Sequence, residues 1–475
     1  MTAARHRPFP GARIAPQYVA IVDTPATIGS FQPLGYGLLL IYLFLIFSRI
    51  FDVKFGSLHI PGISFRVIFV IVLVSGAFLV AIKTRIGRPM TFMFLWFVAS
   101  IATSVWRRGS IYCLTEAEIP SFVLFLATAG LMANFTQLRR AMSVMAFAFF
   151  VLTLIAVVWG STEETGRLYL PQGKFSNPNE MAQALLLGMP LWWLVFRATK
   201  NLGMRVVALG VLALMLRMLS KTGSRGGLIA LGAVVLVAFL RAPILGKLKL
   251  ILATFLFITV AVITMPGKLL QRYATIGDSD TPVASMGDPD LDDSLASAVT
   301  SAQTRRYLLK ESIKLTFRHP LFGVGPAMFP VAEDADAIAQ GKRHGAWQGT
   351  HNSYTEVSCE IGIPGAVAYM LVIFLSLKQS WRLYRTTCGD PRLQDIANCA
   401  LSLNYCLIVY AVTVFFDYIA FTSMLSVFAG LVAVLVRVAQ PEIERRTAKP
   451  SPAGPVPLVA FRPRWGAPAP VAPRV

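Results

Sequence analysis

The 475-residue sequence has few charged residues and few cysteines, and both shortages limit what it can be. Only 14% of the residues are charged and 55% are hydrophobic, a balance outside the range of soluble globular domains. The five cysteines have no paired spacing and no Cys/His cluster, which excludes a zinc finger and a disulfide framework. No apolar stretch with a cleavage site precedes the first long hydrophobic run, so we expect no removable signal peptide. The composition therefore indicates a polytopic membrane protein.

About twelve apolar runs are long enough to cross the roughly 30 Å hydrocarbon core of a bilayer as helices. They lie at 33–51, 65–82, 90–106, 119–135, 141–159, 181–197, 204–220, 225–240, 248–265, 362–380, 397–416 and 419–437. The runs lack the alternation of barrel strands, so the predicted fold is an all-α membrane bundle. We place spans 1–9 within 33–265 and spans 10–12 within 362–437, between flexible tails at 1–32 and 438–475.

Lys and Arg concentrate in alternate loops, such as Lys83 and Arg85 after the second run and Arg139 and Arg140 after the fourth. Cytoplasmic loops are enriched in these residues, so an even number of spans predicts that both termini are cytoplasmic. The net charge of +20 follows mostly from this bias and suits anionic lipid surfaces. Without a soluble basic domain to carry it, nucleic-acid binding is not expected.

The longest outward loop, 266–361, separates the ninth and tenth spans, and loops of this size are usually functional. Its Asp-rich part, 278–293, matches no motif that assigns it a role.

Residues 303–318 of this loop repeat Leu309, Ile313 and Phe317 at four-residue steps, which predicts an amphipathic helix. His319 and Pro320 are expected to end it. Arg305 would lie on the apolar, inward face and pair with a buried anion; the alternative is a helix lying on the membrane surface.

Arg225 begins the eighth predicted span, next to Gly226 and Gly227. A helix N-terminus and a planar guanidinium both favour phosphate oxygens, so this position predicts an anion site. The alternative is an interfacial arginine that reaches lipid head groups.

The stretch GTHNSYTEVSCEIGIPGAVAYML, residues 349–371, places His351 just before the tenth span. An imidazole can be neutral and accept a proton at ambient pH, although a lone His can also be structural. Glu356 and Glu360 share one helical face, and we expect them to orient or tune the imidazole. Two arginines and a histidine base are the set needed for a sugar hydroxyl to displace a polyprenyl diphosphate without a metal ion.

Four stretches together resemble the O-antigen ligase and O-antigen polymerase superfamily of bacterial envelope glycosyltransferases. They are THNSYTEVSCEIGIPG (350–365), HPLFGVGPAMF (319–329), SRGG (224–227) and FSNPNEMAQ (175–183). The resemblance runs from about 170 to 370, and the order of the motifs, the twelve spans and the large outer loop fit it.

The resemblance implies a GT-C-like fold in the bacterial inner membrane, an active site on the periplasmic face, and no metal or nucleotide cofactor. The implied donor is an undecaprenyl-diphosphate-linked oligosaccharide, and the acceptor is a repeat unit or lipid A core. Membrane lipids and chain-length regulator or export proteins are the further partners.

By motif, the resemblance assigns His351 as the base and Arg225 and Arg305 as the residues on the diphosphate. A one-residue slip would put Arg306 in the place of Arg305. The FSNPNEMAQ motif adds two residues expected to line the site, Asn177 and Asn179.

The first functional hypothesis is polymerisation of exopolysaccharide or O-antigen, and the second is a ligase that transfers the glycan to lipid A core. A lipid-linked glycan flippase or transporter is a more distant alternative. It would predict inverted repeats and ionisable groups near mid-membrane. The sequence shows no repeat, and only Arg217 and Asp417 qualify as such groups.

Overall fold

The computed structural model describes residues 31–51, 60–163, 165–171, 177–274 and 289–447. The chain is helical in nearly all of this part, apart from a two-residue antiparallel pair, β1 (Ser161–Thr162) and β2 (Leu168–Tyr169). Helices satisfy their backbone hydrogen bonds internally, as a segment within lipid must. Most of both predicted tails and most of the Asp-rich segment lie outside the described residues.

The helices that precede the large loop are α1 (Gln32–Ser48), α3 (Ile60–Val74), α4 (Ala77–Lys83), α5 (Gly87–Ser100), α6 (Arg107–Cys113), α7 (Ile119–Leu131), α8 (Phe135–Trp159), α9 (Pro178–Ala198), α10 (Leu202–Lys221), α11 (Arg225–Arg241) and α12 (Ile244–Thr264). The loop contains α13 (Gly267–Ala274), α14 (Pro289–Arg318), α15 (Phe329–Ala339) and α16 (Ser353–Glu360). The chain then forms α17 (Gly362–Thr387), α18 (Gln394–Thr413) and α19 (Ser423–Thr447). Short 3-10 and π turns are η1 (Ile101–Thr103), η2 (Leu114–Glu118) and η3 (Pro391–Leu393).

Each of the twelve apolar runs is mostly helical, although the run 65–82 is divided between α3 and α4, and this confirms the all-α membrane fold. Among the described residues, eight helices are long and apolar enough to cross a membrane, or nine if one bent pair is counted as a span. That pair, Phe65–Val74 and Ala77–Lys83, is bent by 80°. The number twelve therefore stays a prediction. At the last span, α19 continues to Thr447, beyond the expected end at 437.

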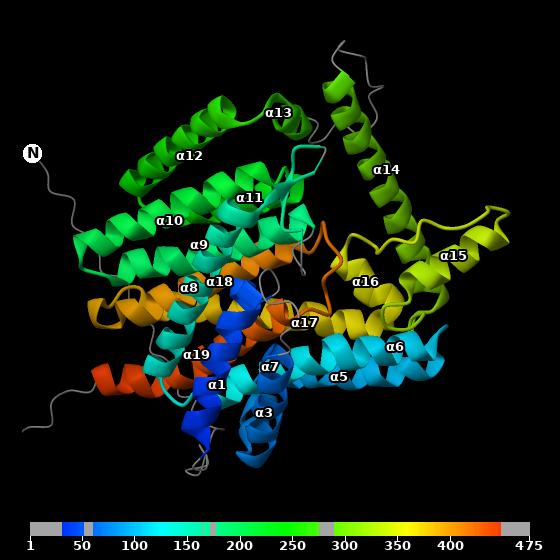
Figure 1. The fold of residues 1–475 in the computed structure, drawn as a ribbon. Helices are drawn as coiled ribbons and strands as arrows, with labels where there is room; N and C mark the ends of the chain where they lie inside the picture. The colour runs from blue at the N-terminus through cyan, green and yellow to red at the C-terminus, as the bar shows by residue number, and fades with distance from the viewer. Residues whose placement is uncertain (1–30, 52–59, 164, 172–176, 275–288, 448–475) are drawn as a thin grey trace, which may run out of the picture.

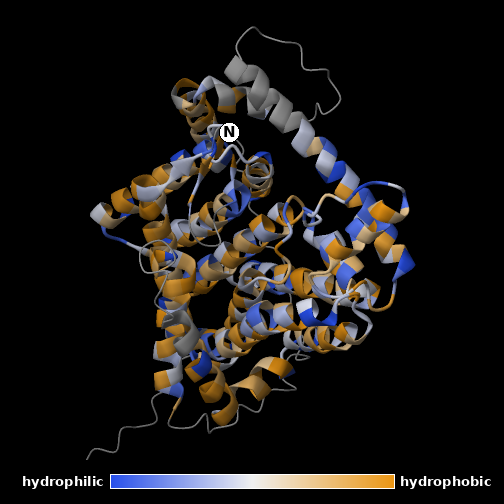
Figure 2. Ribbon diagram, turned by 45° about the vertical axis from the view of Figure 1, so that its right-hand side comes forward, coloured by the Kyte–Doolittle hydropathy of each residue, from blue (hydrophilic) through white to orange (hydrophobic). Residues whose placement is uncertain are grey.

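The core of the bundle lies where α18 packs between α9 and α17, and where α19 packs along α7. The largest fully buried side chains there include Tyr369, Tyr410 and Phe428. In contrast, α12 exposes most of its large apolar side chains, as expected of a helix that faces lipid. Figure 2 shows hydrophobic residues along the bundle helices and hydrophilic ones gathered over α14 and α15.

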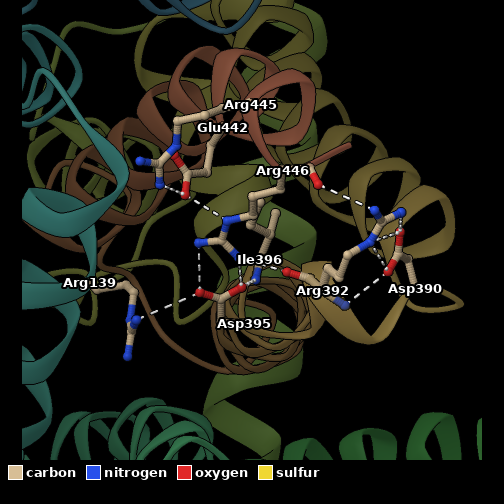
Figure 3. A network of polar contacts seen from close by, with 8 residues as sticks. All are labelled: Arg139, Asp390, Arg392, Asp395, Ile396, Glu442, Arg445 and Arg446. Atoms are coloured by element: carbon tan, nitrogen blue, oxygen red, sulfur yellow. Dashed lines mark hydrogen bonds and ion pairs between the residues drawn. The ribbon is translucent and has the colours of Figure 1, made fainter. Parts of the chain in front are cut away.

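Figure 1 places α14, α15 and α16 together at one end of the bundle, which we call the loop end. The opposite end lies roughly 39 Å away along the 26 residues of α17. There, ion pairs join α8, α18 and α19 (Figure 3). Arg446 contacts Asp395 at 2.6 Å and Glu442 at 2.6 Å, and Arg139 lies 3.6 Å from Asp395. These contacts fix the extension of α19 against the start of α18.

The large loop is built mainly of helices, and α14 ends at Arg318 as predicted. Its packed face differs from the expected one. Ile313 and Phe317 are exposed, whereas Leu308, Ser312 and Leu315 are buried. The four-residue repeat therefore marks an outer stripe, because α15 and α16 cover the neighbouring face of the helix.

The turn after α14 packs against the end of α16. Val324 N donates to Cys359 O (2.8 Å) and Gly325 N donates to Glu360 O (2.9 Å). Gly323 has a φ of +67°, and a Cβ there would collide with the Glu360 carbonyl. The GVGP sequence thus turns against the helix that follows His351.

We expect Gly323→Ala to lower the free energy of unfolding by about 1 to 3 kcal/mol, because Ala is strained at positive φ and has no room there. Thermal denaturation of the purified protein in detergent measures this. Gly210→Ala is the control, since a Cβ at this helical position meets nothing within 4 Å. Equal melting temperatures for the two variants would contradict the packing of the turn.

Candidate active site

His351 lies two residues before α16, in a left-handed backbone conformation (φ +52°). Its ring meets the Tyr418 ring edge-on, with centroids 5.1 Å apart, and its Nδ1 atom is buried without a hydrogen-bond partner. Burial, and then the positive charge of Arg305, lower the pKa of this imidazole to about 4. His351 is therefore neutral near pH 7, as a proton acceptor must be.

Arg305 lies one turn before Leu308, on the packed side of α14, and is half-buried, whereas Arg306 is exposed. The inward position predicted for Arg305 thus holds, although a different stripe of α14 packs. Burial and the charge of Arg225 lower the pKa of Arg305, and the Asp417 carboxylate opposes them. The charge of Arg305 acts on His351, and that of Arg225 acts on Arg305, whereas the side chain of Arg306 is exposed.

Asp417 lies in the connection between α18 and α19 and faces this group of cations. It is 3% exposed; its Oδ1 accepts a hydrogen bond from Tyr418 N (3.0 Å), while Oδ2 has no hydrogen-bond partner. Burial raises the pKa of this carboxyl to about 6, against the lowering effects of Arg305 and Arg167. Asp417 therefore lies at the loop end, in contact with the site, and not at mid-membrane.

Arg225 is the first residue of α11, and a serine side chain caps the N-terminus of this helix. Ser224 is the N-cap, and its Oγ accepts a hydrogen bond from Gly227 N (3.1 Å). A Cβ at Gly226 would lie 2.8 Å from Phe416, and one at Gly227 would lie 3.0 Å from Ala182. The glycines thus serve helix packing, and the amide of Gly227 is already bonded. The guanidinium of Arg225, more than free backbone amides, is what this turn offers to an anion.

Arg167 is a site residue that sequence reasoning missed. It lies between β1 and β2 and is buried. Its Nε donates to Thr222 O (3.0 Å) and its Nη2 donates to Asn179 Oδ1 (3.0 Å), while Glu163 lies 3.9 Å from Nη1. Burial is the main cause that lowers the pKa of Arg167 to about 10. The Glu163 carboxylate opposes this effect, and the charges of Arg305 and Arg225 add to it. The available indication was an arginine in a loop that is predicted to face outward, where the positive-inside rule leaves few.

The two asparagines of the FSNPNEMAQ motif have different roles. Asn177 is the N-cap of α9, where its Oδ1 accepts from Asn179 N (2.9 Å). Asn179 Oδ1 accepts from both Ser224 Oγ (2.9 Å) and Arg167 Nη2 (3.0 Å). Asn179 therefore joins the first outer loop to the start of α11, and Asn177 shapes the helix that carries it.

Glu356 and Glu360 hold backbone around the site, and their hydrogen bonds do not run to the imidazole. Glu356 Oε2 accepts from Ala420 N (3.1 Å), which fixes the connection that contains Asp417. Glu360 accepts from Ala327 N (2.7 Å) and Phe329 N (3.1 Å), which fixes the turn after α14. Burial raises the pKa of both carboxyls, that of Glu360 to about 7. The structure shows a role in loop placement, and the expectation that they orient or tune the imidazole stays a prediction.

The cysteines are unpaired thiols, including Cys113 and Cys359 near this end. The site therefore depends on noncovalent contacts between segments far apart in the chain.

The fold and the site define a class: an α-helical membrane protein in which the charges of three arginines act on one another at one end of the bundle, and one of them, Arg305, also acts on a neutral imidazole. Residues 210–370 match the family model described as O-Antigen ligase, a range that includes Arg225, Arg305 and His351. The match supports the resemblance to the O-antigen ligase and polymerase superfamily over this part of the chain. Together with the apolar helices, the match points to a bacterial membrane protein and supports glycosyltransferase activity of the ligase or polymerase type. No curated protein sequence matches the chain.

Arg305→Gln should raise the pKa of His351 from about 4 toward, but not to, its ordinary 6.5, because it removes one of two lowering causes and leaves burial. The imidazolium fraction at pH 5 to 6 then rises, and the site loses its neutral base in that range. NMR titration of labelled histidines, assigned with His351→Asn, measures the shift. Arg306→Gln at the exposed neighbour is the control. The same His351 pKa in wild type and Arg305→Gln would contradict the proximity of the two residues.

Arg167→Lys should reduce glycan transfer at least tenfold, because a lysine keeps the charge but cannot link Thr222 O and Asn179 with one planar fork. The lost contacts are worth roughly 1 to 3 kcal/mol. Surface polysaccharide produced by a deletion strain carrying each variant is the measurement. Arg197→Lys, at an exposed arginine of α9, is the control and should match wild type.

Proposed function

We propose that the protein moves a glycan from undecaprenyl diphosphate onto a sugar hydroxyl at the periplasmic face of the bacterial inner membrane. The observation that carries the proposal is a set of three arginines whose charges act on one another, in which Asn179 links Arg167 to Ser224, the residue before Arg225. The charge of Arg305 also acts on the neutral imidazole of His351. Like charges repel, so cations held this close favour a polyvalent anion between them. A diphosphate suits the planar fork of arginine.

The proposed reaction is a displacement at the anomeric carbon of the donor sugar. The acceptor hydroxyl oxygen forms a bond to that carbon as the bond to the diphosphate oxygen breaks. The electron pair of the broken bond leaves with the diphosphate, and the hydroxyl proton passes to the His351 imidazole. Arg225 and Arg305 stabilise the charge that grows on the leaving group, so the proposal needs no metal or nucleotide cofactor.

The low pKa of His351 fits this scheme once the donor is bound. An imidazole with a pKa of about 4 is a weak base at neutral pH. Bound diphosphate would offset the charge of Arg305, one of the two causes of the lowering. Donor binding thus raises the basicity of His351 at the moment when the base is needed.

The charge distribution supports the proposed orientation. Arg139, Arg392 and Arg446 lie at the far end, which the positive-inside rule assigns to the cytoplasm together with both termini. The loop end, with the site, then faces the periplasm. The exposed apolar side chains of α12 and the outer stripe of α14 would contact membrane lipids.

Polymerisation and ligation share this chemistry and differ in the acceptor. We keep polymerisation of exopolysaccharide or O-antigen as the first proposal, with transfer to lipid A core as the alternative. The description of the matching family, O-Antigen ligase, is the observation that favours the alternative. Partners of either product, such as chain-length regulator or export proteins, would meet the glycan at the loop end.

His351→Ala should reduce transfer by about 10²- to 10⁴-fold, the usual contribution of a general base. Arg225→Ala and Arg305→Ala should each cost roughly 2 to 4 kcal/mol of transition-state stabilisation. Lipid-linked donor should accumulate while the protein stays inserted in the membrane. Glycan on gels and extracted lipid-linked donor are the measurements, in a strain lacking the chromosomal gene.

The matched controls are His319→Ala and Arg306→Ala, which change exposed residues close to the predicted ones. Normal polysaccharide in the His351→Ala variant would contradict the role of His351 as the base. Donor trapped on the cytoplasmic side would identify a flippase, whereas donor on the outer side identifies a transferase. Lipid A core that carries only one repeat unit would indicate that a polymerase is missing. Uncapped lipid A core together with intact polymer would indicate that a ligase is missing.

A further inference from the structure

The loop that leads into His351, residues 344–351, is held in an unusual backbone conformation. Trp347 and His351 both have a φ of +52°. Among the described residues, four non-glycine residues have positive φ, and two of them are in this loop. Such conformations are rare for bulky side chains and tend to persist at ligand clamps and active sites.

Contacts to α15 fix the first part of this loop. Asp334 Oδ1 accepts from Gly345 N (2.6 Å) and from the indole Nε1 of Trp347 (3.0 Å). The neighbouring Glu333 is fully buried and accepts from Ala346 N (2.8 Å). Two adjacent carboxylates therefore set both the path of the backbone and the direction of the indole ring.

The second part of the loop is fixed against the site. Gly349 packs on Tyr418 so closely that a Cβ would collide with its ring, and Tyr418 in turn meets the ring of His351. Four residues of chain can span at most about 14 Å, so the Cα atoms of Trp347 and His351 lie within that distance of each other. The loop is thus one rigid piece that carries an indole and the proposed base.

Trp347 is nevertheless 59% exposed. Trp347 is held in place although its side chain is largely exposed. It therefore offers an apolar surface that is already ordered before a ligand binds. The exposed side chains of His344 and Gln348 add hydrogen-bonding groups on either side. A flat apolar face bordered by polar groups matches a pyranose ring, which has an apolar C–H face and a rim of hydroxyls.

We propose that Trp347 is a binding platform for a saccharide unit of the glycan, stacked on the indole face. The inference deepens the proposed function and rests on it, because the sugar next to a diphosphate bound by the arginines must lie near His351. The alternative occupant of an exposed tryptophan is the lipid interface, where the indole N–H commonly faces the head groups. Here Asp334 occupies that N–H, which favours the sugar.

The test compares the binding of two lipids by full-length protein in nanodiscs, in a His351→Ala background that prevents turnover. One probe is undecaprenyl diphosphate carrying the host's surface oligosaccharide, and the other is undecaprenyl diphosphate without sugar. Trp347→Ala should weaken binding of the glycosylated lipid by about tenfold and leave binding of the sugar-free lipid unchanged. Trp347→Phe, which keeps a smaller ring, should fall between Ala and wild type.

Trp106→Ala is the matched control, because this tryptophan is also exposed (53%) and lies beside the turn after α14. It should bind both lipids like the parent. Equal weakening of both lipids in Trp347→Ala would overturn the proposal in favour of a lipid anchor, and unchanged binding of both would overturn it outright. If the parent protein itself binds neither lipid, the proposed function fails as well, and that outcome is distinct from the other two.

Discussion

Electrostatic repulsion among Arg167, Arg225 and Arg305 is the constraint on which the loop end depends. Each guanidinium is partly or largely withdrawn from water, and neighbouring positive charges further disfavour the protonated forms of Arg167 and Arg305. A protein can tolerate such a group only if other contacts hold it in place. Neutral acceptors do so for Arg167, namely the Thr222 carbonyl and the Asn179 side chain. These acceptors carry no full charge, and the carboxylates of Glu163 and Asp417 offset only part of the three positive charges, so a net positive potential remains available to a ligand.

The backbone around the cations is fixed by buried carboxylates that point away from the imidazole. Glu356 holds the α18–α19 connection, and Glu360 holds the turn after α14. Both lie on α16, directly after His351. One short helix therefore sets the position of the base, of Asp417 and of the end of α14 at once. Rigid support of this kind is what a site with repelling charges requires.

Much of the fold could be predicted from the sequence, because hydropathy depends on local composition. Every apolar run is mostly helical, and one of them, 65–82, forms two helices. The packed face of α14 could not be predicted, since Leu309, Ile313 and Phe317 form a regular repeat and only contacts with α15 and α16 decide which stripe is covered. At the site, His351, Arg225 and Arg305 were found through motifs and positions at helix ends. Arg167 and Asp417 lie in connections without such patterns, and only the tertiary structure brings them to the cations.

The same repulsion bears on the order of events in the proposed reaction. In the protein without donor, the charge of Arg305 works against protonation of His351, so an acceptor hydroxyl that arrived first would meet a poor base. A bound diphosphate reduces that penalty. The proton acceptor thus becomes competent only when the leaving group is in place, which couples deprotonation of the acceptor to the presence of a donor. Because the coupling acts through charge, it needs no moving lid, and the rigid packing of α14, α16 and the α18–α19 connection is enough to sustain it.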